Sequence, residues 1–395
     1  MKALSKIAAG VSPSATLAVS ALAKKMKAEG KDVIGFGAGE PDFATPDRIS
    51  YAGVRAICDG KTRYTPAAGM IELRQAICDR AKADYGLEYE PTQAVVASGA
   101  KHMVYIALAA LVDPGDEVIV PAPYWVSYYE MVRLFGGVPV VVNVSEEQGF
   151  QLTPEQLEHA ITDKTKAIIL NNPSNPTGAV YPKEALKAVA DVCVKHDLYI
   201  ISDEIYDKLV YDGVPFTSVA ALSDEIKAHT ILINGVSKTY AMTGWRIGWL
   251  ILPDELVTPV ENLQASLALC PPAISQVAGR AAFTPESRAE LDSHVERYRA
   301  ARAVLLEELP KAGFTTMAEP DGGLYLWLDV SHVTDDSEAW CHELIEEIGV
   351  AFAPGIDFDP VNGHKWVRLT LCAPEEERVG SNCAGLPPAP SGFLT

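Results

Sequence analysis

The sequence predicts an α/β fold, in which the large domain is a mainly parallel sheet with helices on both faces. Short apolar segments rich in β-branched residues alternate with segments of helical periodicity through the middle of the chain. Such segments are typical of strands that are buried on both faces of a parallel sheet. After about residue 290 the pattern changes, and it predicts a second, smaller α+β domain.

The predicted strands of the large domain are short and bounded by turn residues. They cover residues 117–120, 138–142, 167–170, 199–202 and 230–233. Residues 182–196 form a predicted helix between two of them, because Leu186, Val189 and Cys193 fall on one helical face. A helical connection of this kind joins parallel strands and packs against their sheet.

The smaller domain is predicted from a charged helical pattern at residues 287–309. It is followed by two predicted strands, at 324–328 and 367–371, with a predicted helix at 337–347 between them. A chain of 395 residues has room for two or three domains. We therefore expect an N-terminal arm with part of the small domain over residues 1–45, the large domain over 46–285, the small domain over 286–377 and a disordered tail over 378–395.

Composition argues against several classes of protein. The 33 basic and 52 acidic side chains give a formal charge of −19, which disfavours nucleic-acid and anionic-membrane partners. No stretch is apolar enough for a membrane span. The seven cysteines are scattered without a Cys/His cluster at zinc spacing, so we expect no metal site, and free thiols in a reducing cytoplasm.

The segment from residue 235 to 248 carries most of the chemical information. Lys238 follows Ser237 just after the predicted strand at 230–233, and Arg246 comes later in the same segment. Parallel α/β sheets bind ligands at the carboxyl ends of their strands. An amine, a hydroxyl and a guanidinium are the groups that a pyridoxal phosphate (PLP) site needs. The alternative is a surface loop, because short motifs also match by chance.

Further candidates follow other predicted strands. Asp203 would keep a pyridine nitrogen protonated, and Tyr206 would reach the 3-oxygen of the ring if the chain turns helical here. Asn175 offers that oxygen an amide donor. Each also has a structural interpretation, because an acid suits a helix N-terminus and Asn is a common turn residue.

Two more segments complete the candidate set. Gly99, Ala100 and Lys101 precede a predicted helix at residues 103–111, where backbone N–H groups can bind a phosphate. Trp125 offers a flat surface for the ring, although an isolated Trp is more often a core residue. All these segments would meet at one edge of the sheet, and their agreement favours the PLP site.

From about residue 4 to about residue 377 the chain resembles fold-type I PLP enzymes of the class I aspartate aminotransferase group. The likeness includes PSAT at residues 13–16, GAGEPDF at 37–43, RYTPAAG at 63–69 and GGLY at 322–325. This combination of motifs is highly specific. It implies the PLP-transferase fold of type I, with a large PLP-binding domain and a smaller α+β domain.

The resemblance implies roles for the residues around the cofactor ring. Lys238 matches the Schiff-base lysine, and Asp203 matches the partner of the pyridine nitrogen. Tyr206 and Asn175 match the pair that binds the 3-oxygen. Trp125 matches the stacking aromatic.

The resemblance also implies the phosphate and substrate sites. Arg368 matches the arginine that binds the substrate α-carboxylate bidentately, with the backbone of Gly39 beside it. Tyr64 matches a tyrosine that contacts the phosphate of the neighbouring subunit, which implies a homodimer with shared active sites. The remaining phosphate ligands are Gly99, Ala100, Lys101, Ser237 and Arg246.

The implied activity is ping-pong transamination of amino acids and 2-oxo acids, with aspartate and 2-oxoglutarate as the leading pair. The amine of Lys238 would move the substrate Cα proton as general base and acid. Prephenate or aromatic transamination and C–S β-elimination remain alternatives, because a fold does not fix a reaction. A ligand-sensing regulator is a more remote alternative, because the motifs start near residue 13 and leave no room for a DNA-binding domain.

Three features depart from the family pattern. Ser12 stands where some relatives have a lysine for the distal carboxylate. The stretch LALC at residues 267–270 is apolar where relatives usually have Ser and Thr, which would favour less polar substrates. The segment after residue 377 has no helical period where the family has a helix on the small domain, and we expect reduced stability or poor closure from this loss.

Overall fold

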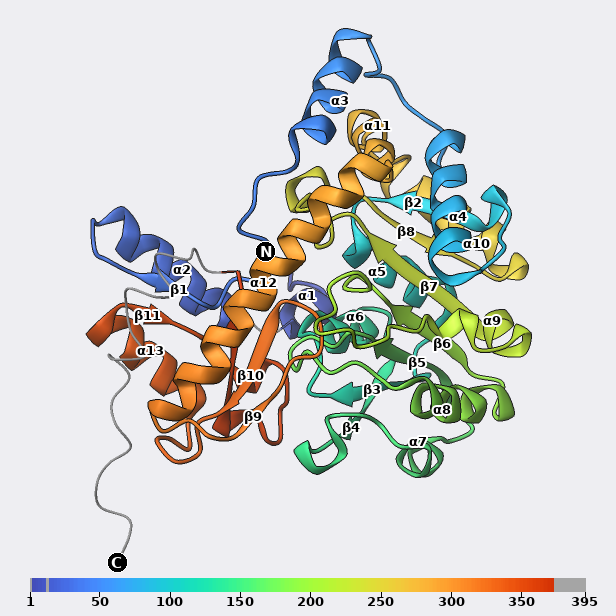
Figure 1. Cartoon of the computed structure of the whole chain (residues 1–395). Coiled ribbons are helices and arrows are strands. Elements are labelled where there is room, and N and C mark those ends of the chain that lie inside the picture. Colours follow the sequence, from blue (N-terminus) through green and yellow to red (C-terminus); the bar gives the residue numbers. More distant parts are fainter. Residues whose placement is uncertain (1, 12–13, 373–395) are drawn as a thin grey trace, which may run out of the picture.

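The computed structural model describes residues 2–11 and 14–372. Its centre is a seven-stranded sheet (Figure 1). β8 runs antiparallel to both of its neighbours, and the other pairs are parallel, so the predicted mainly parallel sheet is confirmed. The strand order is β2 (Ala94–Ala97), β8 (Gly248–Ile251), β7 (Thr230–Gly235), β6 (Tyr199–Asp203), β5 (Thr165–Asn171), β3 (Glu117–Ala122) and β4 (Val138–Asn143).

Helices cover both faces of this sheet. Ala167 and Ile169 pack in one core cluster with α5 (Ala100–Leu111). Ile168, between them, points to the other face and packs with α8 (Lys183–Lys195). Because successive strand residues are buried on opposite faces, the strands show no polar alternation, which is the pattern that predicted them.

A smaller sheet lies beside the first, and the long helix α12 (Pro285–Lys311) runs from one to the other (Figure 1). Its order is β12 (Ala353–Pro354), β13 (Trp366–Thr370), β10 (Tyr325–Asp329) and β9 (Met317–Ala318), all antiparallel. The N-terminal β1 (Ile34–Gly35) pairs with β11 (Val350–Ala351), so the first residues of the chain join the C-terminal part.

The other helices precede the first strand or lie between strands in the chain. Figure 1 shows α3 extending beyond the body of the molecule, where it contacts α11. None of the helices in the described part of the chain is long and apolar enough to cross a membrane. The remaining helices are α1 (Lys6–Gly10), α2 (Ala15–Ala28), α3 (Asp47–Cys58), α4 (Ile71–Tyr85), α6 (Ser127–Leu134), α7 (Pro154–Ala160), α9 (Asp224–His229), α10 (Asp254–Ala268), α11 (Ala273–Ala281) and α13 (Ser337–Ile348).

The condition set for Tyr206 is not met. The chain after Asp203 does not turn helical, and Tyr206 lies in consecutive turns. The Asp203 carboxylate accepts a hydrogen bond from the Ile205 N–H, and Val210 forms a β-bridge with Gly322 a few residues later. These bonds direct the chain toward the smaller sheet instead of into a helix. Ser12 and the predicted tail lie outside the described residues.

Candidate active site

Lys238 lies just beyond the end of β7 and is half-buried, whereas its neighbours in the chain are buried. Its Nζ donates a hydrogen bond to the carbonyl oxygen of Gly39, which belongs to the chain between β1 and α3. A Cβ at Gly39 would lie 2.5 Å from the Tyr325 hydroxyl oxygen, so only glycine fits at this point. The N-terminal segment, β7 and β10 therefore meet around the lysine amine.

Asp203 ends β6 and is 3% exposed. Its Oδ2 accepts a hydrogen bond of 2.7 Å from the Tyr128 hydroxyl, and its Oδ1 accepts one of 3.2 Å from the Ile205 N–H. Burial raises the pKa of the Asp203 carboxyl to about 6, against these two bonds and the charge of Lys238. A cation placed against this carboxylate would therefore be strongly favoured.

Tyr206 and Tyr325 approach each other from the two sheets. Their hydroxyl oxygens are 3.1 Å apart, and their rings pack edge to face with centroids 5.9 Å apart. Burial raises the pKa of Tyr206 well above its ordinary value. The hydroxyl therefore stays protonated at neutral pH and is able to donate a hydrogen bond to an anionic oxygen.

Arg368 on β13 is a buried guanidinium, 4% exposed. Nη1 donates to Oδ1 of Asn175 over 3.0 Å, and Nη2 donates to the Gly37 carbonyl over 2.9 Å. The guanidinium lies 4.2 Å from the centre of the Tyr325 ring. Among the described residues no carboxylate pairs with Arg368, and its buried Nε has no hydrogen-bond partner. The carboxylate of a bound ligand would supply both the opposite charge and an acceptor for Nε.

A second cationic group lies at the start of α5. Gly99 precedes the helix with φ +88°, and no side chain caps the helix N-terminus. The exposed Arg246 guanidinium donates to the carbonyl oxygens of Thr243 at 2.9 Å and Ser98 at 3.3 Å. A Cβ at Gly99 would overlap that guanidinium. The helix N-terminus and Arg246 together form a site for a phosphate.

Several of the predicted site residues contact one another in pairs: Lys238 with Gly39, Arg368 with Asn175, and Arg246 with Gly99. The Lys101 ammonium lies 5.2 Å from the centre of the Trp125 ring, and Trp125 packs edge to face on Tyr128, the partner of Asp203. Ala100 is the first residue of α5, and Ser237 is buried next to Lys238.

Tyr64 is apart from this group. It is 85% exposed, in the segment between α3 and α4.

Sequence reasoning missed two tyrosines of this site, Tyr128 and Tyr325. Tyr128 orients Asp203, and Tyr325 contacts Tyr206, Arg368 and Gly39. Both are buried aromatic residues within a helix or strand, and such residues are usually explained by core packing. The signal for Tyr325 was its place in the GGLY motif.

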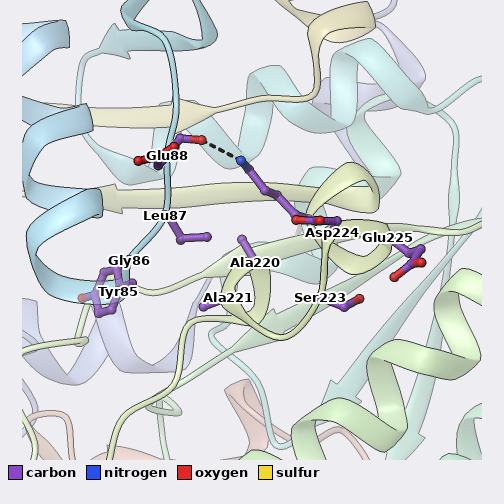
Figure 2. Close-up of a pocket in the computed structure, with 10 residues that line it drawn as sticks. Tyr85, Gly86, Leu87, Glu88, Ala220, Ala221, Ser223, Asp224 and Glu225 are labelled. Atoms are coloured by element: carbon purple, nitrogen blue, oxygen red, sulfur yellow. Dashed lines mark hydrogen bonds between the residues drawn. The ribbon is translucent and has the colours of Figure 1, made fainter.

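A surface pocket of about 710 Å³ lies elsewhere, between the end of α4 and the start of α9. Figure 2 shows Leu87 and Ala220 on its walls, and Lys227 donates to the Glu88 carbonyl oxygen over 2.6 Å. None of the predicted site residues lines it. Within the described residues no cluster of three His, Cys, Asp or Glu side chains could hold a metal ion.

Comparisons with known proteins agree on one family. The family model for aminotransferase class I and II matches residues 31–386. The aspartate aminotransferase of Bacillus subtilis is 44% identical over 360 residues, which cover 90% of this chain and 91% of the relative. The aspartate/prephenate aminotransferase of Thermus thermophilus is 43% identical and covers 95% of this chain and 96% of the relative. The solved structure of Thermus thermophilus aspartate aminotransferase with maleate matches with a TM-score of 0.90 at 42% identity, over 95% of this chain and 97% of that one.

Proposed function

This chain belongs to the class I and II aminotransferases and is a transaminase, and we propose that it transfers the amino group of L-aspartate to 2-oxoglutarate with PLP as cofactor. The observation that carries the substrate class is Arg368. A buried guanidinium without a described acidic partner is costly, and the carboxylate of an amino acid would neutralise it bidentately.

The described residues fit PLP at three separate points. The buried Asp203 carboxylate suits a pyridinium nitrogen, which would supply the missing cation. The uncapped start of α5 and Arg246 suit the phosphate. Lys238 suits the aldehyde, because the described residues give its amine one hydrogen-bond partner, the backbone carbonyl of Gly39. Each fit rests on a polar group for which the described residues provide no matching charge in contact.

When bound, PLP supplies an aldehyde for amino groups and a protonated ring that accepts electron density from the substrate Cα. Lys238 would provide the amine that holds this aldehyde in the resting protein. With its amine free, Nζ would take the proton from the substrate Cα and return a proton as general acid. Its hydrogen bond to the Gly39 carbonyl holds the amine beside the segment that also contacts Tyr325.

The other side chains orient the reactants and control charge. Asp203 keeps the pyridine nitrogen protonated, and Tyr128 fixes the orientation of that carboxylate. Tyr206 and Asn175 would donate hydrogen bonds to the 3-oxygen of the cofactor. Arg368 holds the α-carboxylate, so that the bond from Cα to its proton stands where Lys238 can reach it.

Aspartate is proposed as the donor because the relatives named above are aspartate or aspartate/prephenate aminotransferases. Prephenate as an amino acceptor is the second candidate, because the names of two relatives from Thermus thermophilus and Cereibacter sphaeroides include it.

We further propose a homodimer in which each subunit supplies Tyr64 to the site of the other. The 85% exposure of this tyrosine supports the proposal, because a single chain gives it no role. The neighbouring helix α3 also exposes Tyr51, Val54 and Ile57, which form an apolar face suited to a second subunit. A cytoplasmic location suits the six described cysteines, which are all free thiols.

The proposal is tested with purified protein loaded with PLP. The wild type should show visible absorbance that aspartate bleaches, and Lys238→Ala should lose that absorbance while folding normally by circular dichroism. A panel of aspartate, alanine and phenylalanine as donors to 2-oxoglutarate, and of prephenate as acceptor, then ranks the substrates. Unchanged absorbance in Lys238→Ala would refute the cofactor assignment, and a preference for alanine would refute the acidic substrate.

A further inference from the structure

The segment that starts at the last residue of β6 contains three buried carboxyl groups within five residues. Asp203, Glu204 and Asp207 are 3%, 1% and 2% exposed. Asp203 faces the proposed cofactor, and Asp207 pairs with Arg80 and accepts a hydrogen bond from Tyr85, both on α4. Glu204 has no part in the proposed reaction, and no ion pair among the described residues includes it. A buried carboxyl group without a cation needs another explanation.

Glu204 is instead held by neutral donors. Its Oε1 accepts three hydrogen bonds, from the Ser202 hydroxyl at 2.9 Å, the Ser218 hydroxyl at 3.0 Å and the Val219 N–H at 3.0 Å. Its Oε2 is buried and has no hydrogen-bond partner among the described residues. Its own N–H donates to the Ile233 carbonyl of β7 over 2.9 Å. The carboxyl group therefore joins β6 to the short helix η3 (Val219–Ala221).

Glu204 directly follows β6, and its N–H continues the hydrogen bonding of the sheet to Ile233 of β7. Successive residues of an extended chain point to opposite faces, so we expect Ser202 and Glu204 on one face and Asp203 on the other. A shift of the backbone at Glu204 would therefore also shift Asp203, to which it is directly bonded. Tyr206 is two residues further along the same turns.

We propose that Glu204 is a positioning residue, which holds the end of β6 through Ser202, Ser218 and Val219 and thereby sets the direction in which Asp203 and Tyr206 enter the active site. This inference rests on the proposed function. It adds a residue on the far side of the strand, which touches neither substrate nor cofactor, to the groups that determine the rate.

The carboxyl group works in this role as a neutral acid. Burial raises the pKa of Glu204 to about 8, in spite of its three hydrogen bonds. The titratable groups that face it are Asp207 in its own turn and Tyr85 and Tyr89 from α4 and the chain after it. None of them is a cation, so ionisation would add a second buried negative charge beside Asp207. The arrangement should therefore weaken as the pH rises through about 8.

Two variants separate this role from simple packing. Glu204→Gln keeps the volume and the acceptor oxygen but cannot ionise, so kcat/KM for aspartate at pH 7 should stay within about threefold of the wild type, and its decline above pH 8 should become shallower. Glu204→Leu leaves three donors without an acceptor, so kcat and PLP affinity should fall by roughly tenfold or more. The exposed Glu225→Gln is the matched control and should change nothing.

A readout without cofactor completes the test. The unfolding temperature of the PLP-free wild type should fall between pH 7 and pH 9 more steeply than that of Glu204→Gln, because only the wild type gains a buried charge in that range. Wild-type PLP affinity and pH profile in both Glu204 variants would overturn the inference. If the wild type itself neither binds PLP through Lys238 nor transaminates, the proposed function fails, and the unfolding measurement still reports on Glu204.

Discussion

At the scale of single residues, Asp203 and Arg368 define what the site binds. Both are buried, and the described residues give neither an opposite charge in contact. Burial of an unpaired charge costs several kcal/mol in general, and proteins accept such a cost where a ligand removes it. The two groups therefore mark the ends of the site that receive a cationic ring nitrogen and an anionic carboxylate.

Arg368→Lys tests the carboxylate end. A lysine presents a point charge and cannot form two parallel hydrogen bonds, so KM for the amino donor should rise about 100-fold, or on the order of 3 kcal/mol. Arg302→Lys is the matched control, because Arg302 is also buried but pairs with Asp212 and Glu319 away from the site. The control should lose stability without a change in KM. Steady-state kinetics on both variants decides, and equal KM values for wild type and Arg368→Lys would contradict the role.

Asp203→Asn tests the other end in PLP-free protein. The pKa of Asp203 is raised to about 6 in the folded chain, so the folded state holds this proton at a pH where the unfolded chain has lost it. The stabilisation is complete below the unfolded pKa and disappears as the pH rises through about 6. Between pH 5 and pH 7 the wild type should lose about 1 kcal/mol relative to Asp203→Asn. Urea unfolding at both pH values measures this, with exposed Asp335→Asn as control, and parallel pH dependences would count against it.

The residues that follow strands were predictable from the sequence, whereas those within elements were not. Asp203, Asn175 and Lys238 stand at strand ends, and the topology of a parallel sheet brings such positions together. Tyr128 and Tyr325 are buried within α6 and β10, where packing accounts for an aromatic residue equally well. Their hydrogen bonds depend on tertiary contacts that no local pattern encodes.

At the scale of elements, the parallel strands were predicted and the antiparallel β8 with its neighbour β2 was missed. Both are four residues long and fully buried, and the segment before β8 contains no regular pattern. Their place in the sheet matters to the site, because Gly248 of β8 packs directly against the backbone of Gly99 and Ala100. The start of α5 is therefore fixed by a strand that local sequence did not reveal.

Gly99→Ala tests the start of α5 as the phosphate site. Alanine is strained at φ +88°, and its Cβ would displace the Arg246 guanidinium, so PLP should bind about tenfold more weakly. Gly86→Ala is the control: it also has positive φ, at the end of α4, but a Cβ there meets nothing within 4 Å. It should lower stability by about 1 kcal/mol and leave PLP affinity unchanged. Fluorescence titration with PLP distinguishes the two, and equal affinities would argue against the site.

At the scale of the whole molecule, the exposed Tyr64 and the apolar face of α3 mean that one chain does not contain a complete site as proposed. The resemblance to the family implies a dimer. Because the structure contains a single chain, the dimer is a proposal. The predicted domain limits at residues 45, 285 and 377 likewise remain predictions. The described residues form three sheets, of seven, four and two strands. Ser12 and the predicted tail are not among the described residues.

Subunit mixing tests the shared site. Tyr64→Phe removes a hydroxyl from the phosphate, so PLP affinity should fall about tenfold in the pure variant. In a hybrid of one Tyr64→Phe subunit and one Lys238→Ala subunit, both changes fall in the same site, and the other site is intact. Equilibrium titration of the hybrid should recover half of the sites with wild-type affinity. Recovery of only the weakened affinity would show that Tyr64 acts within its own chain.

The central claim is that Lys238 holds PLP and performs the proton transfer of a transaminase. The most direct test is reduction of the PLP-loaded protein with borohydride, followed by peptide mass mapping. The account predicts a single phosphopyridoxyl addition on the peptide that contains Lys238, and none after prior incubation with aspartate, which releases the lysine. An addition on any other lysine, or an addition that aspartate does not prevent, would contradict it.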